Sequence, residues 1–392
     1  MNHLPSALRL IVFVLVTLAV SGCGRVTDYV YGEDNTAPPA ELKKLEEPVV
    51  VRTAWSRDVG SGGGRGASGL IPVLHGDTVY AAERGGDVMA FDAQTGATRW
   101  SVNIDLVLTG GPGTNGKIVV LGTENGEISA LDASTGSIIW ETRVSSEVLA
   151  PPRLAEGVII IRSVDGKLTA LDAETGDVRW NYDRSVPVLS LRGTSAPTIE
   201  DGLVVAGFDS GRLVAVDLND GQTVWERRVA VPRGRSELER LVDIDAEPLV
   251  LDETVYVATF QGRVAALDLY SGDVVWRRDM SSHSGLGLDD DYVFVTDEKS
   301  HVWGLSRDNS ASLWRQRELE NRALTSPRRF ADYVVVGDLE GQVHWLNVDD
   351  GRVVGRTRVG SSPLYAAPVV GDGLVYIFSS DGTLSALRAA TE

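Results

Sequence analysis

The sequence predicts an all-β protein, a single eight-bladed β-propeller with four-stranded blades. A frame that runs from a glycine to a tryptophan recurs along the chain, and the ends of successive frames lie about forty residues apart. Eight such end positions are found when Trp55 and Gly355 are counted. Four short strands in a unit of this length are typical of propellers, in which closing the ring removes the open sheet edges. An open solenoid would instead need capping repeats at both ends.

Residues 1–22 have the pattern of a signal peptide. Arg9 precedes an apolar run over residues 10–20, which is too short for a comfortable transmembrane span, and small residues precede Cys23. Residues 20–23, Val-Ser-Gly-Cys, resemble the lipobox of bacterial lipoproteins. The resemblance implies cleavage before Cys23 and acylation of that residue, and the alternative is an ordinary leader with an incidental cysteine. Because Cys23 is the only cysteine, no intramolecular disulfide is expected.

Residues 23–47 are predicted to be the lipidated cysteine and a flexible tether. This stretch contains Pro38-Pro39 and a charged segment over residues 41–47. Fully extended, it reaches at most roughly 80 to 90 Å. Three acyl chains would hold it on a membrane, because each buried CH₂ contributes roughly 0.8 kcal/mol. By the lipoprotein resemblance, Gly24 after the cysteine, rather than an aspartate, implies the outer membrane.

Residues 48–392 are predicted to form the ring, and the recurring unit is a β-hairpin. In the frame from Gly166 to Trp180, one strand precedes a tight turn over residues 172–176, and a second strand ends at the tryptophan. Asp172 suits the turn because its carboxylate accepts backbone N–H groups, and Gly176 suits it because the closing residue needs positive φ. The repeated tryptophans are expected to pack between neighbouring blades. The frame recurs at 86–100, 126–140, 211–225 and 262–276, in weaker form at 300–314 and 341–355, and in part at 382–392.

The partial frame at 382–392 predicts how the ring closes. It stops before its second strand, and a matching strand with a terminal tryptophan stands near the start of the ring, over residues 49–55. Each of the eight frames has a partner for its first strand only if the segment 49–55 serves as the second strand of the last frame. We therefore expect the N-terminal strand to complete the eighth blade beside the C-terminal hairpin.

Two successive connections between blades are unusually long. Measured from the end of one frame to the proline that opens the next blade, three of the others span 11 to 13 residues, whereas those after Trp180 and Trp225 span 17 and 23. Connections of this kind emerge on one face of a propeller, so the two long ones must lie side by side. They contain an apolar and charged set of side chains, namely Leu189, Leu191, Arg192, Asp243 and Asp245.

Adjacent long loops of this composition on a rigid ring are a candidate protein interface. The alternative is that Arg192 pairs with Asp243 or Asp245 and only braces the two loops.

Composition and the remaining motifs give no sign of catalysis. The formal net charge of −18 disfavours nucleic acid or a generic anionic membrane surface as the main partner. His75, His283, His301 and His344 fall in different blades without metal-ligand spacing, so no metal site is expected. No helix pattern follows the glycine-rich stretch 60–66, so it is expected to be a mobile loop and not a phosphate cradle.

The frame Gly-x-Val-x-Ala-Leu-Asp-x-x-Thr-Gly-x-x-x-Trp resembles the repeat of pyrroloquinoline-quinone (PQQ) dehydrogenases. With a lipobox, Leu-Ser-Leu-Arg-Gly at 189–193 and Asp-Ile-Asp at 243–245, the whole chain resembles the outer-membrane assembly factor BamB family. The resemblance implies a non-enzymatic scaffold without a cofactor, lipid-anchored at the outer membrane and facing the periplasm. It further implies binding to the POTRA domains of BamA in the BAM complex and assistance to unfolded outer-membrane protein clients. The family's BamA-binding positions match Leu189, Leu191, Arg192, Asp243 and Asp245.

Two other functions share parts of this pattern. A PQQ-dependent dehydrogenase has the same repeat, but many of these enzymes carry a vicinal cysteine pair against the quinone, which a chain with only Cys23 cannot supply. A propeller lipoprotein that binds a small ligand or another envelope partner would share every feature except the two long loops. Capture of BamA from solubilised envelopes would favour the scaffold. Oxidation of an alcohol or sugar in the presence of quinone and calcium would favour the dehydrogenase.

Overall fold

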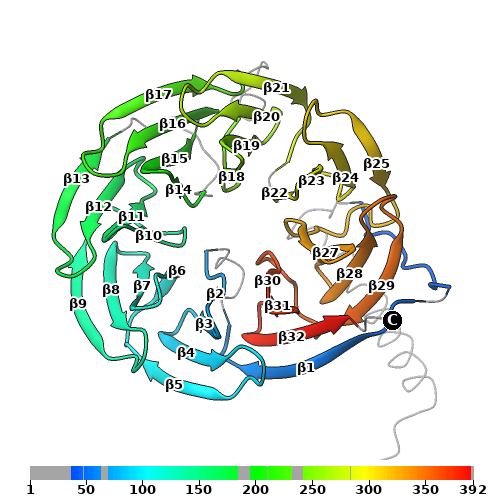
Figure 1. The fold of residues 1–392 in the computed structure, drawn as a ribbon. Helices are drawn as coiled ribbons and strands as arrows, with labels where there is room; N and C mark the ends of the chain where they lie inside the picture. The colour runs from blue at the N-terminus through cyan, green and yellow to red at the C-terminus, as the bar shows by residue number, and fades with distance from the viewer. Residues whose placement is uncertain are drawn as a thin grey trace, which may run out of the picture. The chain divides into compact units, whose positions relative to one another are not determined.

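A ring of strands makes up the part of the chain that the structure describes. The structure, a computed structural model, describes residues 37–46, 48–62, 69–183, 195–209, 211–231, 242–282 and 284–389. Ala40–Glu392 form one unit, and Met1–Pro39 form another. The described residues contain 32 strands in eight four-stranded sheets, arranged as the blades of a propeller (Figure 1). The eight-bladed ring predicted from the spacing of the frames is confirmed.

Each blade runs outward from the axis in chain order, except the eighth (Figure 1). Blades 1 to 4 contain β2 (Val73–His75), β3 (Thr78–Ala82), β4 (Asp87–Asp92) and β5 (Thr98–Asn103); β6 (Leu108–Thr114), β7 (Ile118–Thr123), β8 (Glu127–Asp132) and β9 (Ile138–Arg143); β10 (Arg153–Ala155), β11 (Val158–Arg162), β12 (Leu168–Asp172) and β13 (Val178–Tyr182); β14 (Thr198–Glu200), β15 (Leu203–Phe208), β16 (Arg212–Asp217) and β17 (Thr223–Arg228). Blades 5 to 8 contain β18 (Leu249–Leu251), β19 (Thr254–Ala258), β20 (Arg263–Asp268) and β21 (Val274–Asp279); β22 (Leu286–Leu288), β23 (Tyr292–Thr296), β24 (Val302–Ser306) and β25 (Ser312–Gln316); β26 (Arg328–Phe330), β27 (Tyr333–Gly337), β28 (Gln342–Asn347) and β29 (Val353–Arg358); β30 (Val369–Gly371), β31 (Leu374–Phe378), β32 (Thr383–Ala389) and β1 (Val51–Asp58).

The eighth blade is assembled from strands at opposite ends of the ring. β1 pairs antiparallel with β32, so that Val51 lies opposite Ala389 and Asp58 lies opposite Thr383. In Figure 1 the blue β1 follows the outer side of the red β32. The predicted closure is therefore confirmed, and it gives the third strand of the last blade a partner on its outer side.

The hairpin turns that have the aspartate and the glycine of the frame show the chemistry expected from these two residues. In blade 3, the Asp172 carboxylate accepts the N–H groups of Glu174 at 2.9 Å and Thr175 at 3.0 Å. Arg179 also pairs with it at 2.7 Å. Because Arg179 and these N–H groups bind the charged form, the pKa of Asp172 is lowered to about 2. Gly176 has a φ of 76°, which a glycine adopts at no steric cost.

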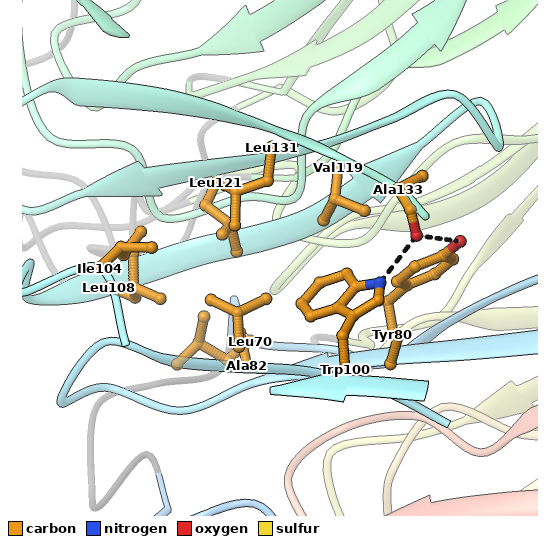
Figure 2. Packing of buried hydrophobic residues seen from close by; sticks show 12 residues of the cluster. Leu70, Tyr80, Ala82, Trp100, Ile104, Leu108, Val119, Leu121, Leu131 and Ala133 are labelled. Carbon is orange, nitrogen blue, oxygen red and sulfur yellow. Dashed lines mark hydrogen bonds between the residues drawn. The ribbon is translucent and has the colours of Figure 1, made fainter. Parts of the chain in front are cut away.

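Apolar clusters fill the spaces between neighbouring blades, and at all but one of these seams a tryptophan of the outer strand joins the two blades. Between blades 1 and 2, Trp100 packs beside Tyr80 against Leu121 and Leu131 (Figure 2). The Trp100 indole N–H donates to the Ala133 carbonyl of the next blade at 2.8 Å. The same bond recurs at seven of the eight seams, from Trp55, Trp100, Trp140, Trp180, Trp225, Trp276 and Trp314. The expected packing role of the tryptophans is confirmed.

In blade 7 the tryptophan is on the third strand and the small residue that faces it is on the fourth, the reverse of the other blades. In the other blades the tryptophan lies opposite an alanine or glycine of the third strand, as Trp100 lies opposite Ala90. In blade 7, Gly355 lies opposite Trp345, whose side chain is fully buried. A tryptophan on the fourth strand would donate its indole N–H to a carbonyl in the turn between the third and fourth strands of the next blade, as Trp100 does. Blade 8 has no such turn, because β32 and β1 are not consecutive in the chain.

Candidate partner-binding face

The connections between blades share one face of the ring with the turns between second and third strands. Backbone hydrogen bonds join the two sets: the Val148 N–H donates to the Thr123 carbonyl at 3.0 Å, and the Phe260 N–H donates to the Asp243 carbonyl at 2.9 Å. We call this side the connection face. As expected, the two long connections both start and end there, one between blades 3 and 4 and the other between blades 4 and 5.

Several residues singled out by the sequence lie outside the described residues. They are Leu189, Leu191 and Arg192 of the first long connection, Cys23, His283, and residues 63–66 of the glycine-rich stretch. Asp243 and Asp245 are described, at the end of the second long connection. The proposed interface and the bracing by Arg192 therefore both stay predictions.

The segment 242–246 is fixed to blades 4 and 5 by alternate side chains. Val242 and Ile244 are each 2% exposed, and Ala246 is 5% exposed. A Cβ added at Gly207 would lie 2.3 Å from Ile244 Cγ2, so only glycine allows this close approach. Asp243 is 1% exposed. A carboxylate buried this deeply contacts the protein's own groups. Asp243 can therefore influence a partner only through the conformation of this segment and not by direct contact.

Asp245 is the more exposed of the two aspartates. It is half-buried, and its Oδ1 has no hydrogen-bond partner among the described residues. Burial, and then the negative charges of Asp243 and Asp209, raise the pKa of Asp245 to about 8. A cationic side chain placed against these carboxylates would relieve their repulsion. This corner of the connection face is therefore suited to an arginine or lysine, from the chain itself or from a partner.

Arg162, at the end of β11, belongs to the same region and was missed in the sequence. It is 3% exposed, lies 4.3 Å over the Phe208 ring, and donates to the Ser163 carbonyl at 2.9 Å. Burial lowers its pKa to about 10, although the charges of Asp209 and Asp165 act in the opposite direction. The available signal was an arginine that ends the apolar run Val-Ile-Ile-Ile at a buried strand position.

We expect Asp245→Asn to stabilise the protein increasingly as the pH rises from 5 to 8. With a raised pKa in the folded state, Asp245 holds its proton longer than in the unfolded chain, so its contribution to stability falls as pH increases from about 4 to 8. The neutral asparagine removes this loss, by linkage on the order of several kcal/mol at pH 8. Thermal unfolding at both pH values measures it, with the exposed Asp349→Asn as control. A constant difference between Asp245→Asn and wild type at all pH values would contradict the prediction.

Exposed aliphatic side chains form a second surface, on the outer strands of blades 2 to 6. They are between 48% and 58% exposed, and they are Ile138, Ile139, Val178, Val224, Val274, Val275 and Leu313. Each outer strand also contains a β-bulge, because the residue before the tryptophan position has no partner opposite it. Bulges increase strand twist and hinder pairing with a further strand.

Neither a metal-binding group nor a membrane-spanning helix is found among the described residues. No group of three or more histidine, cysteine, aspartate or glutamate side chains in these parts of the chain is arranged to hold a metal ion. Within the same parts, no helix has the length and apolar character needed to cross a membrane.

Comparison with known proteins gives matches along nearly the whole chain. The family model described as outer membrane protein assembly factor BamB matches residues 51–106, 84–316 and 317–391. The outer membrane protein assembly factor BamB of Pseudomonas aeruginosa is 48% identical over 371 residues, which cover 95% of this chain and 96% of that protein.

Two solved structures show the range of the fold. The crystal structure of BamB from Moraxella catarrhalis has a TM-score of 0.80 and 30% identity, and the match covers 86% of this chain and all of that one. Quinohemoprotein alcohol dehydrogenase ADHIIG from Pseudomonas putida HK5 has a TM-score of 0.68 at 14% identity, over 87% of this chain and 77% of that one. The second similarity concerns the fold alone.

Proposed function

The chain belongs to the family of the outer membrane protein assembly factor BamB, and on that premise we propose that it is a scaffold subunit of the BAM complex. In this role it binds the POTRA domains of BamA and assists the folding and insertion of unfolded outer-membrane proteins. The observation that supports this role most is the similarity to the outer membrane protein assembly factor BamB of Pseudomonas aeruginosa. That similarity covers 95% of this chain and is not confined to the repeats.

We assign the contact with BamA to the connection face at blades 3 to 5. Leu189, Leu191 and Arg192 would supply the contacts from the first long connection, with Asp245 at the edge of the second. Asp243 would act through the shape of that second connection, because its side chain is buried. The Oδ1 of Asp245, which has no hydrogen-bond partner among the described residues, and the nearby negative charges of Asp243 and Asp209 support a basic side chain as its counterpart.

The protein is proposed to be non-enzymatic and to reach its partners from a lipid anchor. Acylation of Cys23, the tether that follows it, and a periplasmic orientation at the outer membrane complete this assignment. The bulged outer strands favour a role in orienting BamA over the addition of client strands to blade edges.

Affinity capture of BamA from detergent-solubilised envelopes tests the scaffold role. Wild-type protein is expected to recover BamA, and Leu191→Ala with Arg192→Ala is expected to abolish recovery while thermal unfolding stays unchanged. Leu313→Ala is the matched control, since it removes a 53% exposed leucine on the rim. Loss of stability in the double variant would favour the bracing role, and failure of wild type to recover BamA would contradict the proposal. Oxidation of an alcohol or sugar after addition of quinone and calcium would instead favour the dehydrogenase.

Cys23→Ser is expected to abolish acylation of the protein. Without the thiol no diacylglyceryl group is attached, and the cleavage before residue 23 that the lipobox resemblance implies is not expected either, so the apolar leader would stay on the chain. Labelling with radioactive palmitate and the electrophoretic mobility of the chain measure this, and Ser21→Ala serves as the control that keeps the cysteine. Palmitate label on Cys23→Ser, or cleavage as complete as in wild type, would contradict the anchor.

A further inference from the structure

One seam of the ring lacks the indole bond that joins the others. Between blades 7 and 8 the usual tryptophan position is Gly355, and the buried Trp345 Nε1 has no partner among the described residues. The bond cannot be made in the usual way there, because β32 and β1 are not joined by a turn. The end of the N-terminal segment lies at this seam.

Residues 40–46 and 48–49 run along the outer strand of blade 7 before the chain enters β1 (Figure 1, blue trace beside β29). The Ala40 N–H donates to the Glu320 carbonyl at 2.9 Å, and the Val49 N–H donates to the Val354 carbonyl at 2.8 Å. Leu42 packs against the apolar cluster between blades 6 and 7. Val49 packs against the cluster between blades 7 and 8. The segment therefore contacts both sides of blade 7.

A buried arginine, Arg322, forms a hydrogen bond with the start of this segment. Arg322 is 2% exposed, its Nε donates to Asp338 Oδ2 at 2.7 Å, and another of its nitrogens pairs with Glu340. Its Nη1 donates to the Ala40 carbonyl at 2.9 Å. Because a buried donor left without an acceptor costs about 1 to 3 kcal/mol, the fold of blade 7 favours the docked segment.

A second arginine, Arg356, binds another backbone carbonyl of the segment, that of Lys43. Arg356 Nη1 donates to the Lys43 carbonyl at 3.1 Å, and its Nε donates to His344 Nδ1 at 3.3 Å. His344 is fully buried, with Nε2 2.8 Å from the Asp338 carboxylate. The two segment carbonyls are thus bound by groups that one buried carboxylate organises. The ion pair of Lys43 with Glu318 is exposed and contributes little.

We propose that residues 40–46 and 48–49 form a clasp that closes the seam between blades 7 and 8 in place of the missing indole bond. The clasp itself is independent of lipidation. Its consequence for the tether rests on the proposed acylation of Cys23: the stretch between that residue and the clasp is then residues 24–39, which would span at most roughly 55 Å if fully extended. Tension on the anchor would enter the ring at β29 and β1, the strand that closes it.

Limited trypsin digestion of the native full-length protein tests the clasp. A protease needs an opened backbone, so a docked segment is cleaved only when it detaches. Cleavage after Lys43 and Lys44 is expected to be at least tenfold slower in wild type than in Leu42→Glu. Hydrogen exchange of the β29 amides is expected to be faster in the variant, with exchange in β13 unchanged. Glu318→Ala, which breaks only the exposed ion pair, is expected to keep the wild-type protection.

Ala40→Pro provides a second variant if Leu42→Glu does not fold, because it removes the N–H that donates to Glu320 and adds no buried charge. It is also expected to speed cleavage at the two lysines. Cleavage of wild type as fast as either variant, or β29 exchange equal in all proteins, would overturn the clasp. The Cys23→Ser protein separates this proposal from the anchor, since it is expected to keep full protection at Lys43 and Lys44 whether or not the anchor exists.

Discussion

Asp338→Ala is expected to lower the free energy of unfolding by about 3 to 5 kcal/mol, the cost of removing one partner from a buried ion pair. The carboxylate is fully buried and binds both Arg322 and His344, so its loss leaves a buried guanidinium and imidazole without their main acceptor. Chemical denaturation followed by tryptophan fluorescence measures the change. Glu340→Ala is the matched control, because Glu340 pairs with the same arginine but is 48% exposed, and it is expected to cost about 1 kcal/mol or less.

The same carboxylate makes the ring sensitive to acid. Burial alone would raise the pKa of Asp338, but hydrogen bonds from His344 and Arg322 outweigh it and hold the pKa below its usual value. Its stabilisation is therefore present above the pKa of an unfolded aspartate, about 4, and is lost as the pH falls through the lower folded value. Equal costs for Asp338→Ala and Glu340→Ala, or a cost of Asp338→Ala that does not shrink in acid, would contradict this account.

Trp345→Ala is expected to cost about 3 to 5 kcal/mol, as large-to-small changes of buried aromatic residues do. The indole fills the space that the other blades fill from the fourth strand, and Gly355 leaves room for it. Denaturant unfolding measures the loss.

The double change Trp345→Ala with Gly355→Trp restores the usual arrangement of the pair. It is expected to recover less than half of the lost stability, because blade 8 offers no turn carbonyl to the new indole. Full recovery would show that the missing turn is not the reason for the exchange.

The sequence contained enough to predict the ring and its closure, because both depend on short frames whose residues act locally. Asp172 and Gly176 set a turn wherever they recur, and the strand ending at Trp55 matches the gap after the last frame. Asp243 and Asp245 were found by comparing loop lengths, which identifies a face without any knowledge of contacts.

The parts that were not predicted depend on contacts between distant residues. The loss of the tryptophan at 355 looked like decay of the repeat, yet Trp345 fills the same space from the paired strand. Arg162 was hidden in a strand pattern, since nothing local shows that it lies over Phe208. The charged composition of residues 41–47 predicts a tether, whereas Ala40 and Lys43 contact the ring through backbone carbonyls, which composition does not reveal.

The pairing of β1 with β32 also bears on biogenesis. During export, the segment around Val51 emerges first and must wait for its partner around Ala389, 338 residues later. Bringing the two together costs roughly 5 kcal/mol of loop-closure entropy, far more than forming a local hairpin. Until then β1 has no paired neighbour, and the apolar faces of blades 1 and 7 that later pack against blade 8 are uncovered. The chain therefore stays open to chaperones and proteases until its last strand arrives.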